Sequence, residues 1–300
     1  MTAASKVEQQ LSIYIITYNR ASCLRETLEA LAVSPFARCR IVVLDNCSTD
    51  DTPAVVTAAM QHIPSMEYRR NVTNIGLGAN AVQPFLLSET TYTWICCDDD
   101  YFDFSKVDDV RAALLVNEAK LLVVGGHVES VRNGAGCIAG ASALIDLGLN
   151  YFRDASFLPS TIYSTAFART FMAECYSLCA LYYPHMAIIL GAHRADVPCY
   201  VSQNRLVTPS IGTQSYSQTS QMRWWFALAD TIRNRSVRRN FLASQFEGPL
   251  DPTGLYGLLN TLVRMKLYAK ALSILPLFNV RVIGSIVRMI GARARGVRYL

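Results

Sequence analysis

The sequence predicts an α/β fold in which a mostly parallel central sheet is flanked by helices and followed by a helical C-terminal region. Short apolar, β-branched segments alternate with segments of helical period over about the first 125 residues. Polar residues follow directly after those apolar segments, as expected where parallel strands end at one edge of a sheet. The 300 residues are 51% hydrophobic and 17% charged, a balance that supports a large core and excludes a disordered chain.

The predicted elements repeat in a regular order. Apolar runs that are too short for buried helices predict strands, and apolar residues every three or four positions predict helices. Each predicted strand is followed by a polar loop and then a helix, an order that implies right-handed crossovers and parallel pairing. The predicted strands are residues 12–17, 40–44, 66–70, 92–97 and 120–125, and the predicted helices are residues 23–32, 53–62, 79–87 and 105–117.

The alternation fades beyond residue 125, and the charge pattern changes again near the C-terminus. We therefore predict three regions, residues 1–125, 126–250 and 251–300. After Asp251 the chain has no acidic residue, whereas apolar residues recur there at helical spacing. Eight basic residues lie in this last region: Arg264, Lys266, Lys270, Arg281, Arg288, Arg293, Arg295 and Arg298.

The last region therefore predicts basic amphipathic helices. Such helices suit an anionic membrane surface better than nucleic acid, because their charges are interleaved with apolar side chains. The alternative is that they pack against the body of the protein and leave the arginine side chains in water.

Cysteine usage and hydropathy indicate a cytoplasmic protein that does not cross the membrane. The nine cysteines are scattered along the chain. They form no pair of C-x-x-C motifs that would indicate a zinc site, and their spacing indicates no disulfide framework. The first ten residues lack the apolar run of a secretory leader. Lys270, Pro276 and Arg281 interrupt the most apolar region, so no stretch is long enough to span a bilayer. We expect a peripheral location at the cytoplasmic face.

An acidic triplet, Asp98, Asp99 and Asp100, closes the predicted strand 92–97. Adjacent carboxylates repel one another, and a hard divalent cation such as Mg²⁺ or Mn²⁺ relieves that repulsion. In extended chain Asp98 and Asp100 point to the same side and can share such a target. The alternative is a solvated acidic turn that caps the helix following it.

Other polar residues after the predicted strands suit a nucleoside. Asp45 ends the second strand, and a fixed carboxylate there would accept the imide N–H of uracil or thymine. Asn74 and Asn80 supply amide groups, and Gly76 allows the backbone to approach a ribose closely. Their alternative is an ordinary turn before a helix.

Four segments together resemble the successive nucleotide-sugar motifs of family 2 glycosyltransferases, which have the GT-A fold. They are YIITYNR (residues 14–20), VVLDNCSTDDT (42–52), NIGLGAN (74–80) and WICCDDDYF (94–102), and their order and spacing both match the family. The resemblance covers about the first third of the chain. It implies a nucleotide-sugar-binding half over 1–125, an acceptor-binding half over 126–250 and the basic tail.

The resemblance also implies roles for individual residues. The positions implied to line the base and the diphosphate are Thr17, Tyr18, Asn19 and Arg20, while Asp45 would face the base and Asn74 and Asn80 would border the nucleotide. The acidic triplet stands where the family has its D-x-D motif, which implies that Asp100 is a metal ligand and that Asp98 faces the ribose.

The general base is where the sequence departs from the common family pattern, because no acidic pair occurs between residues 150 and 200. His185 lies in the corresponding region, after Pro184, at the expected start of a helix. It is a candidate base, a candidate third metal ligand or a hydrogen-bonded core histidine. Asp154 is the second candidate for the base.

These features predict a metal-dependent glycosyltransferase that moves a sugar from a UDP- or dTDP-sugar to a hydroxyl of a lipid-linked or surface-polysaccharide glycan. Mn²⁺ or Mg²⁺ is the expected cofactor. Inversion at the anomeric carbon is favoured, and retention is the alternative. A nucleotidylyltransferase would require a Gly-rich loop after the first strand, and residues 17–20 contain no glycine. A non-catalytic glycan- or lipid-binding module would not need the acidic triplet.

Overall fold

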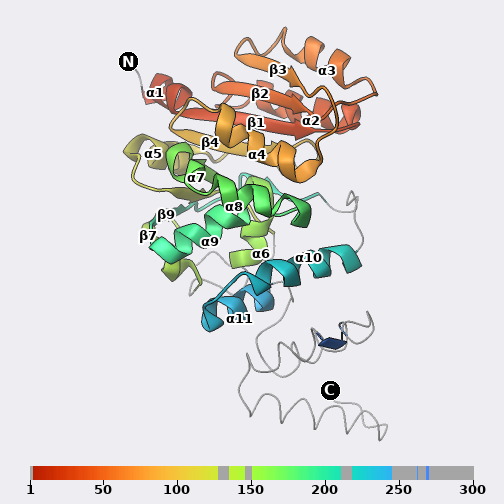
Figure 1. The fold of residues 1–300 in the computed structure, drawn as a ribbon. Coiled ribbons are helices and arrows are strands. Elements are labelled where there is room, and N and C mark those ends of the chain that lie inside the picture. Colours follow the sequence, from red (N-terminus) through yellow and green to blue (C-terminus); the bar gives the residue numbers. More distant parts are fainter. Residues whose placement is uncertain are drawn as a thin grey trace, which may run out of the picture. The chain divides into compact units, whose positions relative to one another are not determined.

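A computed structural model describes residues 3–127, 135–145, 151–210 and 218–244, together with residues 262, 268 and 269. The chain divides into two compact units, Met1–Ser215 and Tyr216–Leu300. The first unit is an α/β structure with a large, mainly parallel sheet, which confirms the predicted fold class (Figure 1). Apart from the three isolated residues, the predicted tail over 251–300 lies outside the described residues.

The central sheet has eight strands in the order β3-β2-β1-β4-β8-β6-β9-β7. The predicted strands are observed to within a few residues. The sheet consists of β1 (Leu11–Thr17), β2 (Arg40–Asp45), β3 (Met66–Arg70), β4 (Tyr92–Cys97), β6 (Leu121–Val123), β7 (Ile138–Gly140), β8 (Thr161–Ser164) and β9 (Pro198–Val201). A separate two-stranded sheet joins β5 (Tyr101–Phe102) to β10 (Val207–Thr208) in antiparallel pairing.

Helices precede or follow most strands of the first unit. The first six α-helices are α1 (Ala3–Gln10), α2 (Ala21–Ala32), α3 (Thr52–Ala59), α4 (Leu77–Leu87), α5 (Asp108–Val116) and α6 (Tyr151–Ser156). The later ones are α7 (Thr165–Arg169), α8 (Met172–Ser177) and α9 (Met186–Ala195), and three short 3₁₀ helices are η1 (Ala141–Ile145), η2 (Leu158–Ser160) and η3 (Cys179–Leu181).

The sheet is buried on both faces, which is why its strands are continuously apolar. Successive side chains of β1 point to opposite faces. Ile13 and Ile15 join a core with Leu24 and Leu28 of α2, and that core also includes residues of α1, α3 and α5. On the other face α4 covers the sheet, where the Phe85 ring meets the Tyr163 ring edge to face at 5.3 Å.

Two strands run against the others, a feature that the apolar pattern did not predict. β8 pairs antiparallel with both β4 and β6, and β7 pairs antiparallel with β9. Since β8 is reversed, its first residues lie at the edge where β4 and β6 end. The turn of η2 before β8 therefore borders the same edge as the loops that follow the parallel strands.

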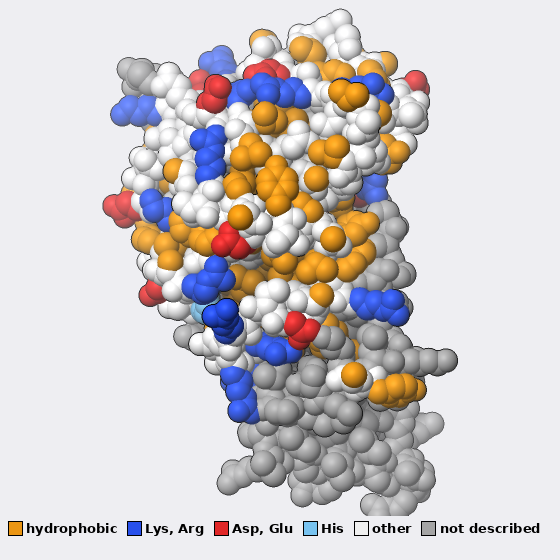
Figure 2. Space-filling model, viewed as in Figure 1, with side chains coloured by type: hydrophobic (Ala, Val, Ile, Leu, Met, Phe, Trp, Pro, Cys, Tyr) orange, Lys and Arg blue, Asp and Glu red, His pale blue; other side chains and the backbone are white. Residues whose placement is uncertain are grey.

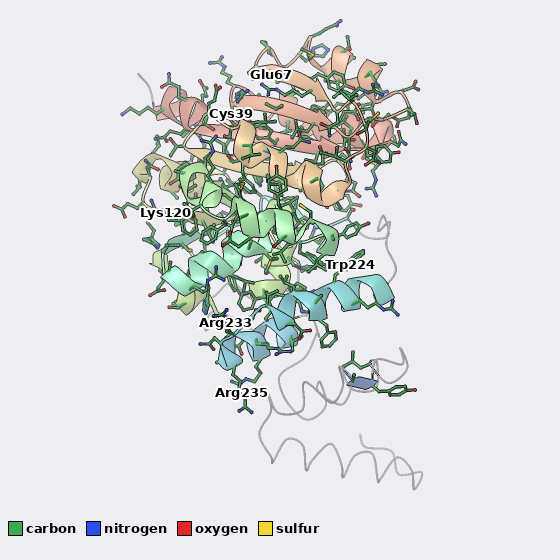
Figure 3. The ribbon with its side chains drawn as sticks, in the orientation of Figure 1. Cys39, Glu67, Lys120, Trp224, Arg233 and Arg235 are labelled. Carbon is green, nitrogen blue, oxygen red and sulfur yellow. The ribbon has the colours of Figure 1, made fainter. Side chains whose placement is uncertain are left out.

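An ion pair joins the outer strands β2 and β3 of the sheet. Arg40 of β2 donates to Glu67 of β3 at 2.8 Å, and Figure 3 labels Glu67 on that strand.

Figure 2 shows hydrophobic side chains on the face that α4 and α8 form. Leu77 and Leu86 of α4 and Tyr176 of α8 are each more than 40% exposed.

The second unit is described over two helices, α10 (Gln218–Asp230) and α11 (Arg235–Ser244). The Trp225 ring stacks on the Phe241 ring at 3.9 Å, and its Nε1 donates to the Phe241 carbonyl at 3.2 Å. Arg233 and Arg235, labelled in Figure 3, are exposed. Within the described residues no helix is both long and apolar enough to span a bilayer.

Trp94 of β4 is among the largest buried side chains of the sheet core. It is fully buried, its Nε1 donates to the Pro159 carbonyl at 2.8 Å, and its ring meets those of Phe36 and Phe104 edge to face. We expect Trp94→Phe to lower the free energy of unfolding by about 2–4 kcal/mol, because it removes buried volume and leaves a buried carbonyl unpaired. Urea unfolding measures this, with Val72→Ala, at a 94% exposed side chain, as the control. Equal losses in the two variants would contradict the packing.

Candidate active site

The ends of β1, β2 and β4 meet at one edge of the sheet. Thr17 is in register with Asp45 of β2, and Ile16 is in register with Cys97 of β4. The Thr17 hydroxyl donates to Asp98 Oδ2 at 2.5 Å. Residues from three separate strand ends, which the sequence predicted to converge, therefore lie side by side.

The acidic triplet is held by a different partner at each carboxylate. Arg20 pairs closely with Asp99, and its Nη1 lies 3.8 Å from Asp98 Oδ1. The Ser210 amide donates to Asp100 Oδ1 at 3.3 Å. Asp100 Oδ2 is buried and has no hydrogen-bond partner, so this oxygen is available to a ligand that can enter.

Burial makes the charges of Asp98 and Asp100 unfavourable. Burial raises the pKa of Asp98 to about 7, with the neighbouring Asp99 adding to the shift and the Thr17 hydroxyl opposing it. Burial and the charge of Asp99 likewise raise the pKa of Asp100 to about 7. A positive charge placed beside Asp100 would favour its ionised form. Such a site is suited to a cation.

Asp45 lies at the same edge but is already satisfied. It is fully buried, and its Oδ1 accepts from the Ser48 amide at 2.7 Å. Its Oδ2 accepts from the Tyr68 hydroxyl at 2.6 Å and lies 3.3 Å from Arg70 Nε. Tyr68 and Arg70 belong to β3, and no pattern in the sequence indicated their contact with Asp45. A nucleobase that approached the Asp45 carboxylate would compete with Tyr68 and Arg70 for its oxygens.

A network of amide side chains lies beside Asp45. The Asn46 amide donates to Asn74 Oδ1 at 2.8 Å, and the Asn71 amide donates to Asn80 Oδ1 at 3.1 Å. Asn74 and Asn80 were predicted site residues, whereas Asn46 and Asn71 were missed. Gly76 has φ +84, which suits glycine, and its amide donates to Asn74 Oδ1 at 2.8 Å. The network fixes the loop that leads into α4.

The loop after β1 is tied to the loop after β2. The Asn19 backbone amide donates to Ser48 Oγ at 2.9 Å, and Asn19 Oδ1 accepts from the Thr49 backbone amide at 2.7 Å. Asn19 has φ +54, a conformation that asparagine tolerates. Tyr18 is 43% exposed beside it, so its ring is accessible to a ligand.

Two further residues, His127 and Asp154, form a pair after β6. His127 Nδ1 lies 3.0 Å from Asp154 Oδ1, and the His127 amide donates to the same oxygen at 2.9 Å. Asp154 was a predicted candidate base, whereas His127 was missed. The available signal was its position directly after the predicted strand 120–125, where polar residues of the other strands also stand.

His185 is built into the core. It is 2% exposed, its Nε2 lies 3.0 Å from the Ala155 carbonyl, and its Nδ1 is buried without a partner. Burial lowers its pKa to about 4, so the ring is neutral. Among the three possibilities that the sequence left open, these contacts favour a core histidine. The sequence alone could not reveal that α6 and α9 enclose the ring.

The raised pKa of Asp100 gives a stability prediction. Because the folded chain holds this proton more tightly than the unfolded chain, the free energy of unfolding should fall as pH rises from about 4 to about 7. We expect Asp100→Asn to remove this component and to be about 1–3 kcal/mol more stable than the unsubstituted chain at pH 8. Urea unfolding at pH 5 and pH 8 in metal-free buffer measures it.

Asp103→Asn provides the matched control. Hydrogen bonds from Ser105 lower the pKa of this exposed carboxylate, so its replacement should bring no gain at pH 8. If Asp100→Asn also brought no gain there, the buried charge would not be unfavourable and the electrostatic description of the site would be wrong.

Residues 12–136 match the family model described as Glycosyl transferase family 2. No curated protein matches the chain. Among solved structures, residues 1–349 of S. aureus TarS in complex with UDP-GlcNAc share 16% identity and a TM-score of 0.64, over 97% of this chain and 93% of that chain.

A second similar structure is the mannosyltransferase PcManGT from Pyrobaculum calidifontis in complex with GDP-Man and Mn²⁺. It shares 12% identity and a TM-score of 0.54, over 93% of this chain and 83% of that chain. Both likenesses concern the fold. Together with the family match they confirm the resemblance seen in the sequence: residues 12–136 match glycosyl transferase family 2, and the fold of the chain is similar to that of these solved structures.

Proposed function

We propose that the chain transfers a sugar from a UDP- or dTDP-sugar to a hydroxyl of a lipid-linked or surface-polysaccharide glycan, with inversion at the anomeric carbon. The observation that carries the proposal is the acidic triplet at the strand ends, in which Asp98 is buried and one buried oxygen of Asp100 has no hydrogen-bond partner. A buried carboxylate oxygen without a partner is costly unless a ligand completes it. Retention, or a non-catalytic binding module on the same fold, are the alternatives.

The donor set suits a hard divalent cation. Among the described residues no group of three or more His, Cys, Asp and Glu side chains could hold a metal ion by itself. Mg²⁺ and Mn²⁺ accept one or two carboxylates together with substrate phosphate oxygens, so the protein need not supply a full set. Asp100, with Asp98 beside it, would hold the ion. When bound, it would offset the negative charge that develops on the leaving diphosphate.

The remaining residues suit the nucleotide. The Arg20 side chain is 30% exposed and lies against the triplet, where its guanidinium would meet a diphosphate. The amide network around Asn74 and Asn80 and the accessible ring of Tyr18 offer polar and stacking contacts. The UDP-GlcNAc bound to TarS supports a uridine donor, and the Mn²⁺ with PcManGT supports a cation.

Donor hydrolysis tests this function without knowledge of the acceptor. We expect the chain to release UDP slowly from a UDP-sugar in the presence of Mn²⁺, and Asp100→Ala to reduce that rate at least 100-fold, because the cation loses its ligand. Chromatography of released UDP measures the rate, and Asp103→Ala is the control. A wild-type chain without hydrolysis would support the non-catalytic module, and an unaffected Asp100→Ala rate would contradict the metal role.

The anomeric configuration of the released sugar, read by NMR, separates inversion from retention.

We also propose that the basic tail places the protein at the cytoplasmic face of the membrane, near a lipid-linked acceptor. We expect the full chain to co-sediment with vesicles that contain phosphatidylglycerol, and a triple variant with Arg281, Arg288 and Arg295 replaced by glutamine to bind them at least tenfold more weakly. Each basic residue near an anionic surface contributes about 1 kcal/mol. Neutral phosphatidylcholine vesicles are the control. Equal binding to both vesicle types would contradict electrostatic docking.

A further inference from the structure

The segment after β6 is shaped to hold a carboxylate. Val124 and Gly125 donate their amides to the Ser160 carbonyl at 2.7 and 2.9 Å, and the Gly126 amide donates to the Val207 carbonyl at 3.1 Å. Gly126 has φ +144, and a Cβ at this position would lie 2.7 Å from Cγ of Asp154. Only glycine therefore allows the Asp154 carboxylate to lie so close to the backbone.

That carboxylate fixes the state of the next residue. Asp154 Oδ1 accepts from the His127 amide and lies within hydrogen-bond distance of His127 Nδ1, so the hydrogen-bond network assigns the ring proton to Nδ1. Nε2 then carries the lone pair. The His127 side chain is 21% exposed, so the ring is partly accessible. Phe157 lies beside the ring, with centroids 6.4 Å apart.

The pair stands at the same edge of the sheet as the acidic triplet. Val207, which accepts from Gly126, is also paired with Phe102, two residues after the triplet. The same short strand leads to Ser210, whose amide donates to Asp100. One segment, residues 206–210, thus connects the loop of His127 to the loop of Asp100.

We propose that His127 is the general base of the transfer and that Asp154 is its positioning residue, an inference that rests on the proposed function. His127 Nε2 takes the proton of the acceptor hydroxyl while that oxygen forms a bond to the anomeric carbon. The bond from the anomeric carbon to the phosphate oxygen breaks, and its electron pair leaves on the nucleoside diphosphate. The imidazolium then returns the proton to solvent.

The environment distinguishes this pair from the other candidates. His185 is enclosed and neutral, with both ring nitrogens buried among α6 and α9. Asp154 is 8% exposed and already accepts two hydrogen bonds at one oxygen, so the ring is the part of the pair that reaches the solvent. Asp154 is the charged group that contacts the ring among the described residues, and its charge would stabilise the imidazolium.

Hydrolysis of a UDP-sugar with Mn²⁺, in which water is the acceptor, tests the pair. We expect His127→Gln to lower kcat at least 100-fold and leave KM for the donor within about threefold. Asp154→Asn keeps an acceptor oxygen but loses the charge, and we expect it to lower kcat about tenfold or more with KM unchanged. Imidazole added to His127→Ala should restore part of the rate. His62→Gln, at an exposed histidine, is the control and should behave as the unsubstituted chain.

Thermal shift with UDP and Mn²⁺ separates this inference from the proposed function. Normal stabilisation of the His127 variants together with a lost rate supports the inference. An unchanged kcat in His127→Gln, no rescue by imidazole, or loss of UDP binding along with the rate would overturn it, because each points to a structural role. If the unsubstituted chain itself neither bound UDP nor hydrolysed the donor, the proposed function would fail and the inference with it.

Discussion

The burial of negative charge at the ends of β1 and β4 is the constraint on which the site depends. Carboxylates that leave water are unfavourable unless hydrogen bonds or opposite charges compensate them. Thr17 compensates Asp98 and Arg20 compensates Asp99, while one oxygen of Asp100 is uncompensated. The large apolar core beneath the edge supplies the stability that permits this arrangement. The proposed cation site rests on this uncompensated oxygen of Asp100.

The reversed strand β8 and the small β5–β10 sheet build the other side of the same edge. β8 brings the turn of η2 to the end of β6, and the Ser160 carbonyl there accepts from two successive amides. The β5–β10 pairing then holds the segment after the acidic triplet against residues 206–210. The part of the first unit beyond residue 125 therefore completes the edge that the parallel strands begin.

The two histidines that contact α6 differ in their environment. His185 and His127 have the same side chain, but burial leaves the first neutral with its contacts inside the core. The His127 side chain is partly exposed, and the Asp154 carboxylate orients its ring. The contrast between Asp45 and Asp100 is similar, since Tyr68 and Arg70 satisfy the first whereas the second retains a buried oxygen without a partner.

Local pattern determined much of this protein. Buried parallel strands need continuous apolar runs, so β1, β2 and β4 were evident from composition and length, and the polar residues at their ends marked the edge at which Asp98 to Asp100 would lie. Four ordered motifs gave the resemblance to the family whose model matches residues 12–136. Tertiary structure alone decided strand direction beyond residue 125, the partners of Asp45 and the pairing of His127 with Asp154. These depend on contacts between residues distant in the chain, such as the 27 positions that separate His127 from Asp154. A periodicity of side chains records which face is buried, but it does not record what covers it.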